Sequence, residues 1–134
     1  MQRIDISDIK VENDVSRFDM DYVVSSLQSL WRKDKSADTI KQSFENSVSF
    51  GLFHKDRQGG FVRAVTDGCI ISWICDLFID EAYRRKGLGR LLMEELLEHP
   101  LVKGTRIYLS ATEDAKKLYE DLGFSFPQSP VYRK

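Results

Sequence analysis

The sequence predicts an α/β fold in which helices flank a mixed, mostly antiparallel β-sheet. Residues 21–31 carry apolar side chains at helical spacing behind an aspartate that can cap a helix, and residues 36–47 indicate a second, more polar helix. Three β-rich runs follow, separated by the hairpin-type sequences DRQGG and DG, at residues 48–55, 60–66 and 70–79. We expect these runs to pair as an antiparallel meander.

The second half of the chain alternates helix and strand patterns. Pro100 and Gly123 end two of the elements, which are a helix at 88–98, a strand at 106–110 and a helix at 114–122. A short terminal strand is expected near Phe124 or Val131, and residues 3–11 have weak strand character. The strand–helix–strand unit from 70 to 110 predicts one parallel pair in the sheet.

Composition limits the possible functions. A chain of 134 residues without repeats or linkers predicts one domain over 1–134, and a net charge of −1 gives no overall field that would recruit nucleic acid or an anionic membrane. No apolar run approaches the length of a membrane span and the first residues lack a secretion signal, so we expect a cytoplasmic protein. Cys69 and Cys75 lie about 20 Å apart along one expected strand, too far for a disulfide. His54 and His99 lack metal-ligand spacing, so no metal is expected.

A basic turn, EAYRRKGLGRLL at residues 81–92, joins the longest expected strand to the helix after it. The N–H groups of a helix N-terminus bind anions, and glycine at 87 and 89 lets a phosphate approach the backbone. Consecutive cations at a helix N-terminus cost stability unless an anion is present. A solvated basic turn is the alternative. The turn lacks the Lys-Ser/Thr ending of a nucleotide P-loop.

Two motifs in this region resemble those of one family. Arg84-x-x-Gly87-x-Gly89 is similar to the coenzyme A pyrophosphate loop of the GNAT superfamily of N-acyltransferases, and DAKKLYEDLGF at 114–124 is similar to that family's Ala-x-x-Leu-Tyr-x-x-x-Gly-Phe. Thr112 stands where many members have asparagine. The expected element order also matches that family. The stretch LSATEDAKKLY, together with SFGLF and VTDG upstream, resembles a branch of small bacterial acetyltransferases with unassigned acceptors.

The resemblance implies a sheet that splays at its parallel pair, with the pantetheine arm of acetyl-CoA between the two strands. Main-chain groups of Leu77, Phe78 and Ile79 would bind this arm and Thr112 would lie near it. The residues implied for the pyrophosphate are Arg84, Arg85, Lys86, Gly87, Leu88, Gly89 and Arg90. Tyr119 is implied both to contact the coenzyme and to act as general acid toward the departing sulfur. On spacing alone, Tyr119 would be a core residue of its helix.

The acceptor side rests on weaker signals. Simple alternation in residues 70–79 places Asp76 on one face with Ile74 and Phe78. Asp76 is the only ionisable side chain of this otherwise buried strand, which makes it a candidate base or acceptor ligand. A structural carboxylate paired with Arg63 is equally compatible, and a bulge would change where Asp76 points. In the family fold the first two helices cover the acceptor, which makes candidates of Trp31, Arg32, Phe53 and Trp73.

The sequence thus predicts an acetyl-CoA-dependent N-acetyltransferase that transfers the acetyl group directly to an amine in a ternary complex. The amine is a small molecule or a peptide, and the protein is a monomer or a homodimer. Two alternatives stay open, a catalytically silent acyl-CoA-binding or interaction module and a nucleotide-binding regulator that uses the same loop.

Overall fold

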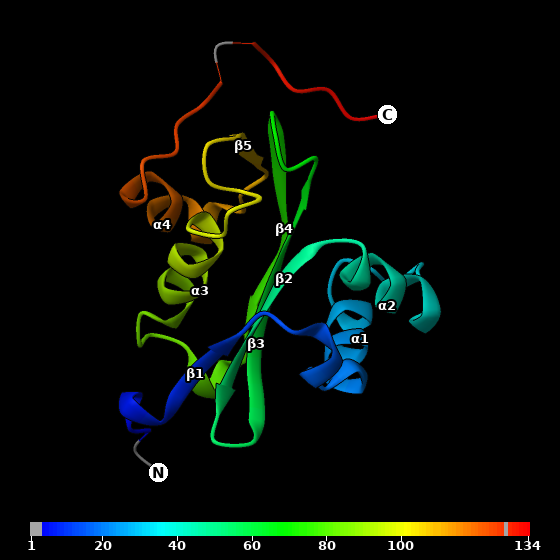
Figure 1. Ribbon diagram of the computed structural model, residues 1–134, viewed down its shortest axis with the longest axis vertical. Helices are drawn as coiled ribbons and strands as arrows, with labels where there is room; N and C mark the ends of the chain where they lie inside the picture. The colour runs from blue at the N-terminus through cyan, green and yellow to red at the C-terminus, as the bar shows by residue number, and fades with distance from the viewer. Residues whose placement is uncertain (1–3, 128) are drawn as a thin grey trace.

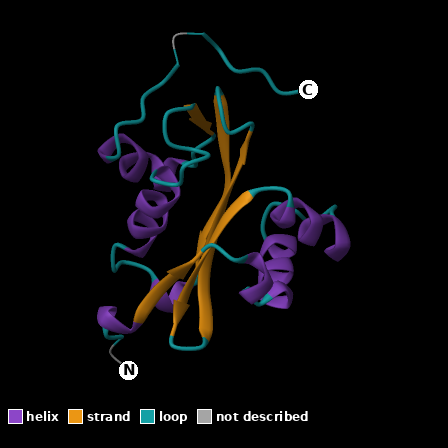
Figure 2. Ribbon diagram, viewed as in Figure 1, coloured by secondary structure: helices purple, strands orange, loops and turns teal. Residues whose placement is uncertain are grey.

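A computed structural model describes residues 4–127 and 129–134. Its five strands form one sheet in the order β1-β2-β3-β4-β5, with β1 at Ile9–Glu12, β2 at Val48–His54, β3 at Arg57–Thr66, β4 at Ile71–Ile79 and β5 at Arg106–Leu109 (Figure 2). The first three pairings are antiparallel and β4 pairs with β5 in parallel. The predicted α/β class and the single parallel pair are therefore confirmed.

Helices cover both faces of the sheet. They are α1 at Met20–Ser29, α2 at Ala37–Glu45, α3 at Leu88–Leu97 and α4 at Lys116–Asp121. Figure 1 shows α1 and α2 on one side of the strands and α3 and α4 on the other. Single 3₁₀ turns at Ile6–Asp8, Val15–Arg17, Glu81–Tyr83 and Glu113–Ala115 precede or join these elements.

Two apolar clusters, one on each face, hold the layers together. Leu92, Met93 and Leu96 of α3 are fully buried against Leu52 and Val62 of the sheet. On the opposite face, the second cluster joins the first two helices to Phe61, and its main members are Phe18, Val23, Leu27, Ile40 and Phe44. Burial of these side chains is the principal stabilising contribution to the packing of helices on the sheet.

The starts of α1 and α2 follow local capping rules, with one shift from the expected residue. The Asp19 side chain, and not Asp21, caps α1 by accepting a hydrogen bond from the N–H of Tyr22 at 3.1 Å. The helix also ends at Ser29, two residues before the predicted end, so that Trp31 leaves the apolar stripe and is 47% exposed. Ser36 caps α2 in the same way.

Three of the expected strand positions differ from the structure. The β2–β3 hairpin turns at Lys55 and Asp56, and Arg57 already belongs to β3, so most of the expected DRQGG loop is strand. No strand forms among the described residues after α4, and Phe126 is 84% exposed there. The weak strand expected over 3–11 is a 3₁₀ turn followed by β1, and residue 3 lies outside the described range.

A bulge interrupts the alternation of β4. The pairing with β3 shifts register between Phe61 and Arg63, which leaves Asp76 and Leu77 opposite one residue of β3. Asp76 takes a left-handed backbone conformation with φ 59°. Leu77 consequently packs on the α3 side, as Ile74 does, and Phe78 packs on the α1 side. The simple alternation predicted for residues 70–79 is therefore wrong beyond Ile74.

Glycine at position 59 should be required by packing. A Cβ there would lie 2.6 Å from the buried Tyr83 ring, so we expect Gly59→Ala to lower the free energy of unfolding, measured by urea denaturation, by about 1–3 kcal/mol. Gly89→Ala is the matched control, because its Cβ would meet nothing closer than 3.7 Å inside α3. It should be neutral or stabilising by about 0.5–1 kcal/mol. Equal stability of the two variants would contradict the packing argument.

Candidate active site

The parallel strands separate partway along the sheet. β4 and β5 pair over four positions, from Ile71 with Arg106 to Ile74 with Leu109, and β5 then ends. β4 continues through Ile79, so residues 75–79 lack a β5 partner. The backbone of β4 is therefore open on one edge beyond the end of β5, at the parallel pair where the family resemblance implied a splay.

Main-chain groups alternate between the two edges of this segment. The N–H of Asp80 donates to Gly59 O at 2.8 Å, and in an antiparallel ladder this directs the groups of Phe78 toward β3 and those of Ile79 toward the open edge. Arg84 Nε in fact donates to Ile79 O at 2.8 Å. The backbone of Ile79 is therefore on the open edge, whereas that of Phe78 belongs to the sheet ladder.

The basic turn leads from this edge into α3. Gly87 is the N-cap of α3 with φ 75°, and no side chain caps the helix. Backbone N–H groups from residue 85 to residue 90 have no protein acceptor within the described part of the chain, and the next one, of Leu91, donates to Gly87 O. No described residue lies within 4 Å of the position of a Gly87 Cβ. Unpaired donors thus gather at the start of α3 beside open space at Gly87, as an anion site requires.

The cations of the turn divide into two groups. Arg84 folds back over the end of β4, where its guanidinium carbon lies 5.8 Å from the centre of the Phe78 ring. Arg90 forms an ion pair with Glu94 at 3.5 Å along the surface of α3. Arg85 and Lys86 are exposed. Arg84 and Arg90 therefore have protein partners, and Arg85 and Lys86 extend from the anion site into solvent.

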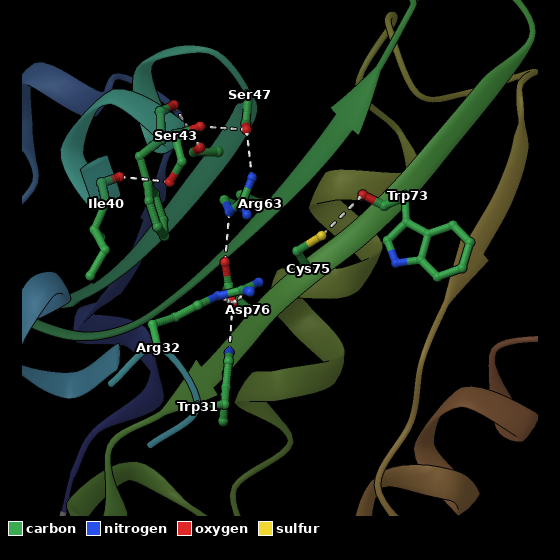
Figure 3. A network of polar contacts seen from close by, with 11 residues as sticks. Trp31, Arg32, Ile40, Ser43, Ser47, Arg63, Trp73, Cys75 and Asp76 are labelled. Atoms are coloured by element: carbon green, nitrogen blue, oxygen red, sulfur yellow. Dashed lines mark hydrogen bonds and ion pairs between the residues drawn. The ribbon is translucent and has the colours of Figure 1, made fainter. Parts of the chain in front are cut away.

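Asp76 is the centre of a polar cluster (Figure 3). Its Oδ1 accepts hydrogen bonds from Trp31 Nε1 at 2.6 Å and Arg32 Nε at 3.1 Å, and its Oδ2 accepts from Arg63 Nε at 2.6 Å. The Asp76 side chain is 1% exposed. The bulge turns this carboxylate to the α1 face, where both oxygens are already occupied by donors.

This cluster connects the loop after α1 to the open strand. Trp31 and Arg32 both lie in the loop that follows α1, and their hydrogen bonds to Asp76 hold this loop against β4. The sequence named Arg63 only as a possible structural partner of Asp76, and that pairing is observed. A lone cation in the apolar run GGFVRAV needs a buried anionic partner, and Asp76 is that partner.

Tyr119 lies in α4, on the α3 side of the sheet. Its ring is 8% exposed and packs in the α3-side cluster, with its centre 6.1 Å from that of Phe124. Its hydroxyl makes no hydrogen bond to any described residue, and it reaches solvent, because no fully buried side-chain oxygen among these residues lacks a partner. Burial of the side chain raises the pKa of Tyr119 above its ordinary value. The hydroxyl therefore carries its proton at neutral pH and has no protein partner that would compete for it.

The remaining predicted residues are not brought together. The Trp73 ring stacks on Tyr108 at 5.6 Å and lies away from Asp76 (Figure 3). Phe53 packs against Phe18 near the β2–β3 hairpin, beside an open hollow lined by charged residues. Thr112 is exposed at the start of the turn before α4. Of the four acceptor candidates, Trp31 and Arg32 therefore meet at Asp76, whereas Phe53 and Trp73 lie elsewhere.

No helix of the described residues has the length and apolarity to cross a bilayer. Over the same residues, His, Cys, Asp and Glu side chains form no group of three or more that could hold a metal ion.

Comparison with known proteins gives consistent results. A spermine/spermidine N(1)-acetyltransferase of Bacillus subtilis strain 168 is 44% identical over 59 residues, which is 40% of this chain and 39% of that protein. The chain therefore spans about two fifths of the length of this curated relative. A crystal structure of an acetyltransferase described as belonging to the GNAT family, from Xanthomonas campestris pv. campestris, is 30% identical with a TM-score of 0.86, covering 94% of this chain and 92% of the other.

The same fold occurs in a structure of an aminoglycoside N-acetyltransferase in complex with CoA. Its TM-score is 0.69 at 16% identity, and the superposition covers 95% of this chain and 93% of the other. Residues 11–134 match the family described as the acetyltransferase (GNAT) domain. Together with the open edge and the basic turn, this match shows that the chain belongs to the GNAT family of acetyltransferases.

Proposed function

We propose that the protein is an acetyl-CoA-dependent N-acetyltransferase that transfers an acetyl group directly to an amine in a ternary complex. The observation that carries this proposal is the continuity between the open edge of β4 and the uncapped N-terminus of α3. The edge offers hydrogen bonds to an extended chain, and the helix N-terminus offers unpaired donors to an anion. One ligand with a phosphate end and an extended arm matches both.

Acetyl-CoA, when bound, supplies the activated acyl group. The residues that would hold it are the main chain of Leu77 and Ile79 at the open edge and the turn at residues 84–90. Arg84 would add charge close to the edge, because its guanidinium already lies there. Phe78 would contribute its side chain and not its backbone, and Thr112 would lie near the arm. The open space at Gly87, which a Cβ would fill, fits the close approach of a phosphate.

Tyr119 is the proposed general acid. Its hydroxyl retains its proton because burial raises the pKa, and it has no partner among the described residues. A phenol of ordinary pKa about 10 facing a thiol of about 8.5 makes complete proton transfer uphill by about 2 kcal/mol. Tyr119 therefore acts by donating a strong hydrogen bond to the leaving sulfur as charge develops on it.

Asp76 is proposed to position the acceptor-binding loop. A lysine-like amine with pKa about 10.4 must lose a proton before it can attack, at a cost of about 4.6 kcal/mol at pH 7. Protonation of Asp76 as a base would weaken its ion pair with the mostly buried Arg63 guanidinium, which opposes that role. Two guanidinium groups at this place also disfavour the protonated form of a nearby amine, which lowers that cost.

The alternative function is a catalytically silent acyl-CoA-binding module. Release of free thiol from acetyl-CoA, followed over a panel of amines, distinguishes the two functions. Acetylated product identified by mass would support the enzyme. Binding of CoA by calorimetry without turnover on any amine would support the module, and competition by ATP would favour a nucleotide-binding regulator.

The Gly87→Val variant tests the anion site. A β-branched side chain at φ 75° would fill the open space beside the unpaired N–H groups, so we expect CoA affinity to fall by about 100-fold or more in calorimetry.

Gly104→Val is the matched control for that variant. Gly104 also has a positive φ, 89°, with nothing within 4 Å of a Cβ, but it lies in the loop before β5. The Gly104→Val variant should lose about as much stability as Gly87→Val and should bind CoA as the wild type does. If both variants bind CoA as well as the wild type, the pyrophosphate site is elsewhere.

Replacement of Asp76 separates positioning from proton transfer. Asp76→Asn leaves the buried Arg63 without its anion, so we expect the free energy of unfolding to fall by about 3 kcal/mol. In the folded fraction, KM for the acceptor should rise while kcat changes by less than about tenfold. A kcat lower by about 100-fold, with the acidic limb of the pH–rate profile removed, would instead identify Asp76 as the base.

Tyr119→Phe should lower kcat and kcat/KM together without changing acetyl-CoA affinity, because the lost hydrogen bond acts on the transition state. The melting temperature should move little, since the hydroxyl has no hydrogen-bond partner among the described residues and the ring packing is kept. A thioester analogue whose leaving thiol has a lower pKa provides the discriminating comparison. The defect should be smaller with this analogue; an equal defect with both thioesters would overturn the assignment.

A further inference from the structure

The cluster around Asp76 contains more positive than negative charge. Arg63 pairs with Asp76 Oδ2 at 2.6 Å and Arg32 pairs with Oδ1 at 3.0 Å. Among the described residues, neither guanidinium forms an ion pair with a second carboxylate. Two cations thus share one carboxylate, and one unit of positive charge at the end of α1 is uncompensated.

Arg32 is the more accessible of the two cations, because Arg63 is mostly enclosed by the protein. The Arg63 side chain is 12% exposed, its Nη1 donates to Ser47 Oγ at 3.0 Å, and its guanidinium lies over the Phe44 ring. The Arg32 side chain is 34% exposed. Its Nε and Nη2 contact Asp76, and its Nη1 has no acceptor among the described residues. Arg32 is therefore the guanidinium with capacity for another anion.

The contacts between Arg32 and Asp76 also leave donors of Arg32 available for that anion. A single oxygen, Oδ1, receives donors from Trp31 Nε1, Arg32 Nε and Arg32 Nη2, whereas a carboxylate oxygen has two lone pairs. Arg32 can keep Nε on Asp76 and present its two Nη groups to a second carboxylate or a phosphate, in the paired geometry that guanidinium favours.

The position of Arg32 relates this anion to the proposed reaction. Asp76 immediately precedes the open edge at Leu77 and Ile79, and Arg32 covers Asp76 on the α1 face (Figure 3). The half-exposed indole of Trp31 lies beside it and offers an apolar surface. If Arg32 binds an anionic group of the acceptor, the amine of that acceptor would lie close to this edge.

A polycationic acceptor fits this place poorly. The loop sequence Arg32–Lys35 has three cations and one anion, and Asp34 is paired with Lys35 at 3.8 Å. Asp80, at the end of β4, accepts hydrogen bonds from Tyr22 Oη and the N–H of Ala82. The acceptor of the Bacillus relative, named as spermine or spermidine, would therefore meet like charge here.

We infer that the acceptor of this enzyme bears an anionic group, a carboxylate or a phosphate, in addition to its amine, and that Arg32 binds this group. The inference rests on the proposed function. It makes Arg32 the residue that sets acceptor class, with Asp76 and Trp31 fixing its orientation.

Matched amines that differ by the anion test the inference. The pairs are L-lysine with cadaverine and phosphoethanolamine with ethanolamine, with spermidine as the polycation. Thiol release from acetyl-CoA is measured for each, and the product is verified by mass. We expect kcat/KM to be at least about tenfold higher for the anionic member of one pair, and the pair that responds identifies the carboxylate or the phosphate as the source.

The Arg32→Gln variant should reduce that preference to less than about threefold without changing acetyl-CoA affinity, because only the acceptor contact is removed. Lys33→Gln is the matched control, with the same loss of charge one residue further along the exposed loop, and it should keep the preference. Binding of the anionic amines to the complex with CoA, followed by calorimetry, provides a second readout that does not depend on turnover.

The outcomes distinguish the two proposals. Acetylation of spermidine, cadaverine and ethanolamine at least as fast as the anionic amines would overturn the inference and leave the proposed function intact, as would an unchanged preference in Arg32→Gln. If Arg32→Gln does not fold, the wild-type comparison within each pair decides alone. Failure to bind acetyl-CoA at all would instead overturn the proposed function, and the inference with it.

Discussion

The bulge in β4 is the feature on which the candidate site depends. By inserting one residue into β4 opposite β3, it places Asp76 on the α1 face and Leu77 and Ile79 on the α3 side. A regular strand would direct Asp76 into the apolar α3 cluster, where a carboxylate has no donors. One strand therefore provides both a buried polar centre on one face and, beyond the end of β5, an open backbone edge.

Charge pairing explains why such a cluster is tolerated inside the protein. Isolated burial of either Asp76 or Arg63 would be strongly unfavourable, but the two groups meet at 2.6 Å with further hydrogen bonds on both sides. The pair also joins distant segments, because Trp31 and Arg32 are 45 and 44 residues away in sequence from Asp76. The polar centre thus stabilises the fold and orders the loop that covers the proposed acceptor position.

The two ends of the proposed site differ in how they are built. The phosphate end is made of backbone at an uncapped helix N-terminus, with Arg85 and Lys86 exposed around it. The acceptor end is made of side chains held by a buried carboxylate. Backbone recognition suits a ligand shared by the whole family, whereas side chains at the end of α1 can vary from one acetyltransferase to another. This difference is consistent with family membership and a chain-specific acceptor.

Local sequence determined the elements and the phosphate end. The buried stripe of α1, the β-meander, the Arg84–Gly89 turn and the apolar face that carries Tyr119 all follow from patterns within about ten residues. The acceptor end was decided by tertiary structure. Whether Asp76 faces α1 or α3 depends on the register between β3 and β4, and which of Trp31, Phe53 and Trp73 reaches it depends on where α1 ends and packs. These contacts join residues far apart in sequence, and no periodicity in a single segment encodes them.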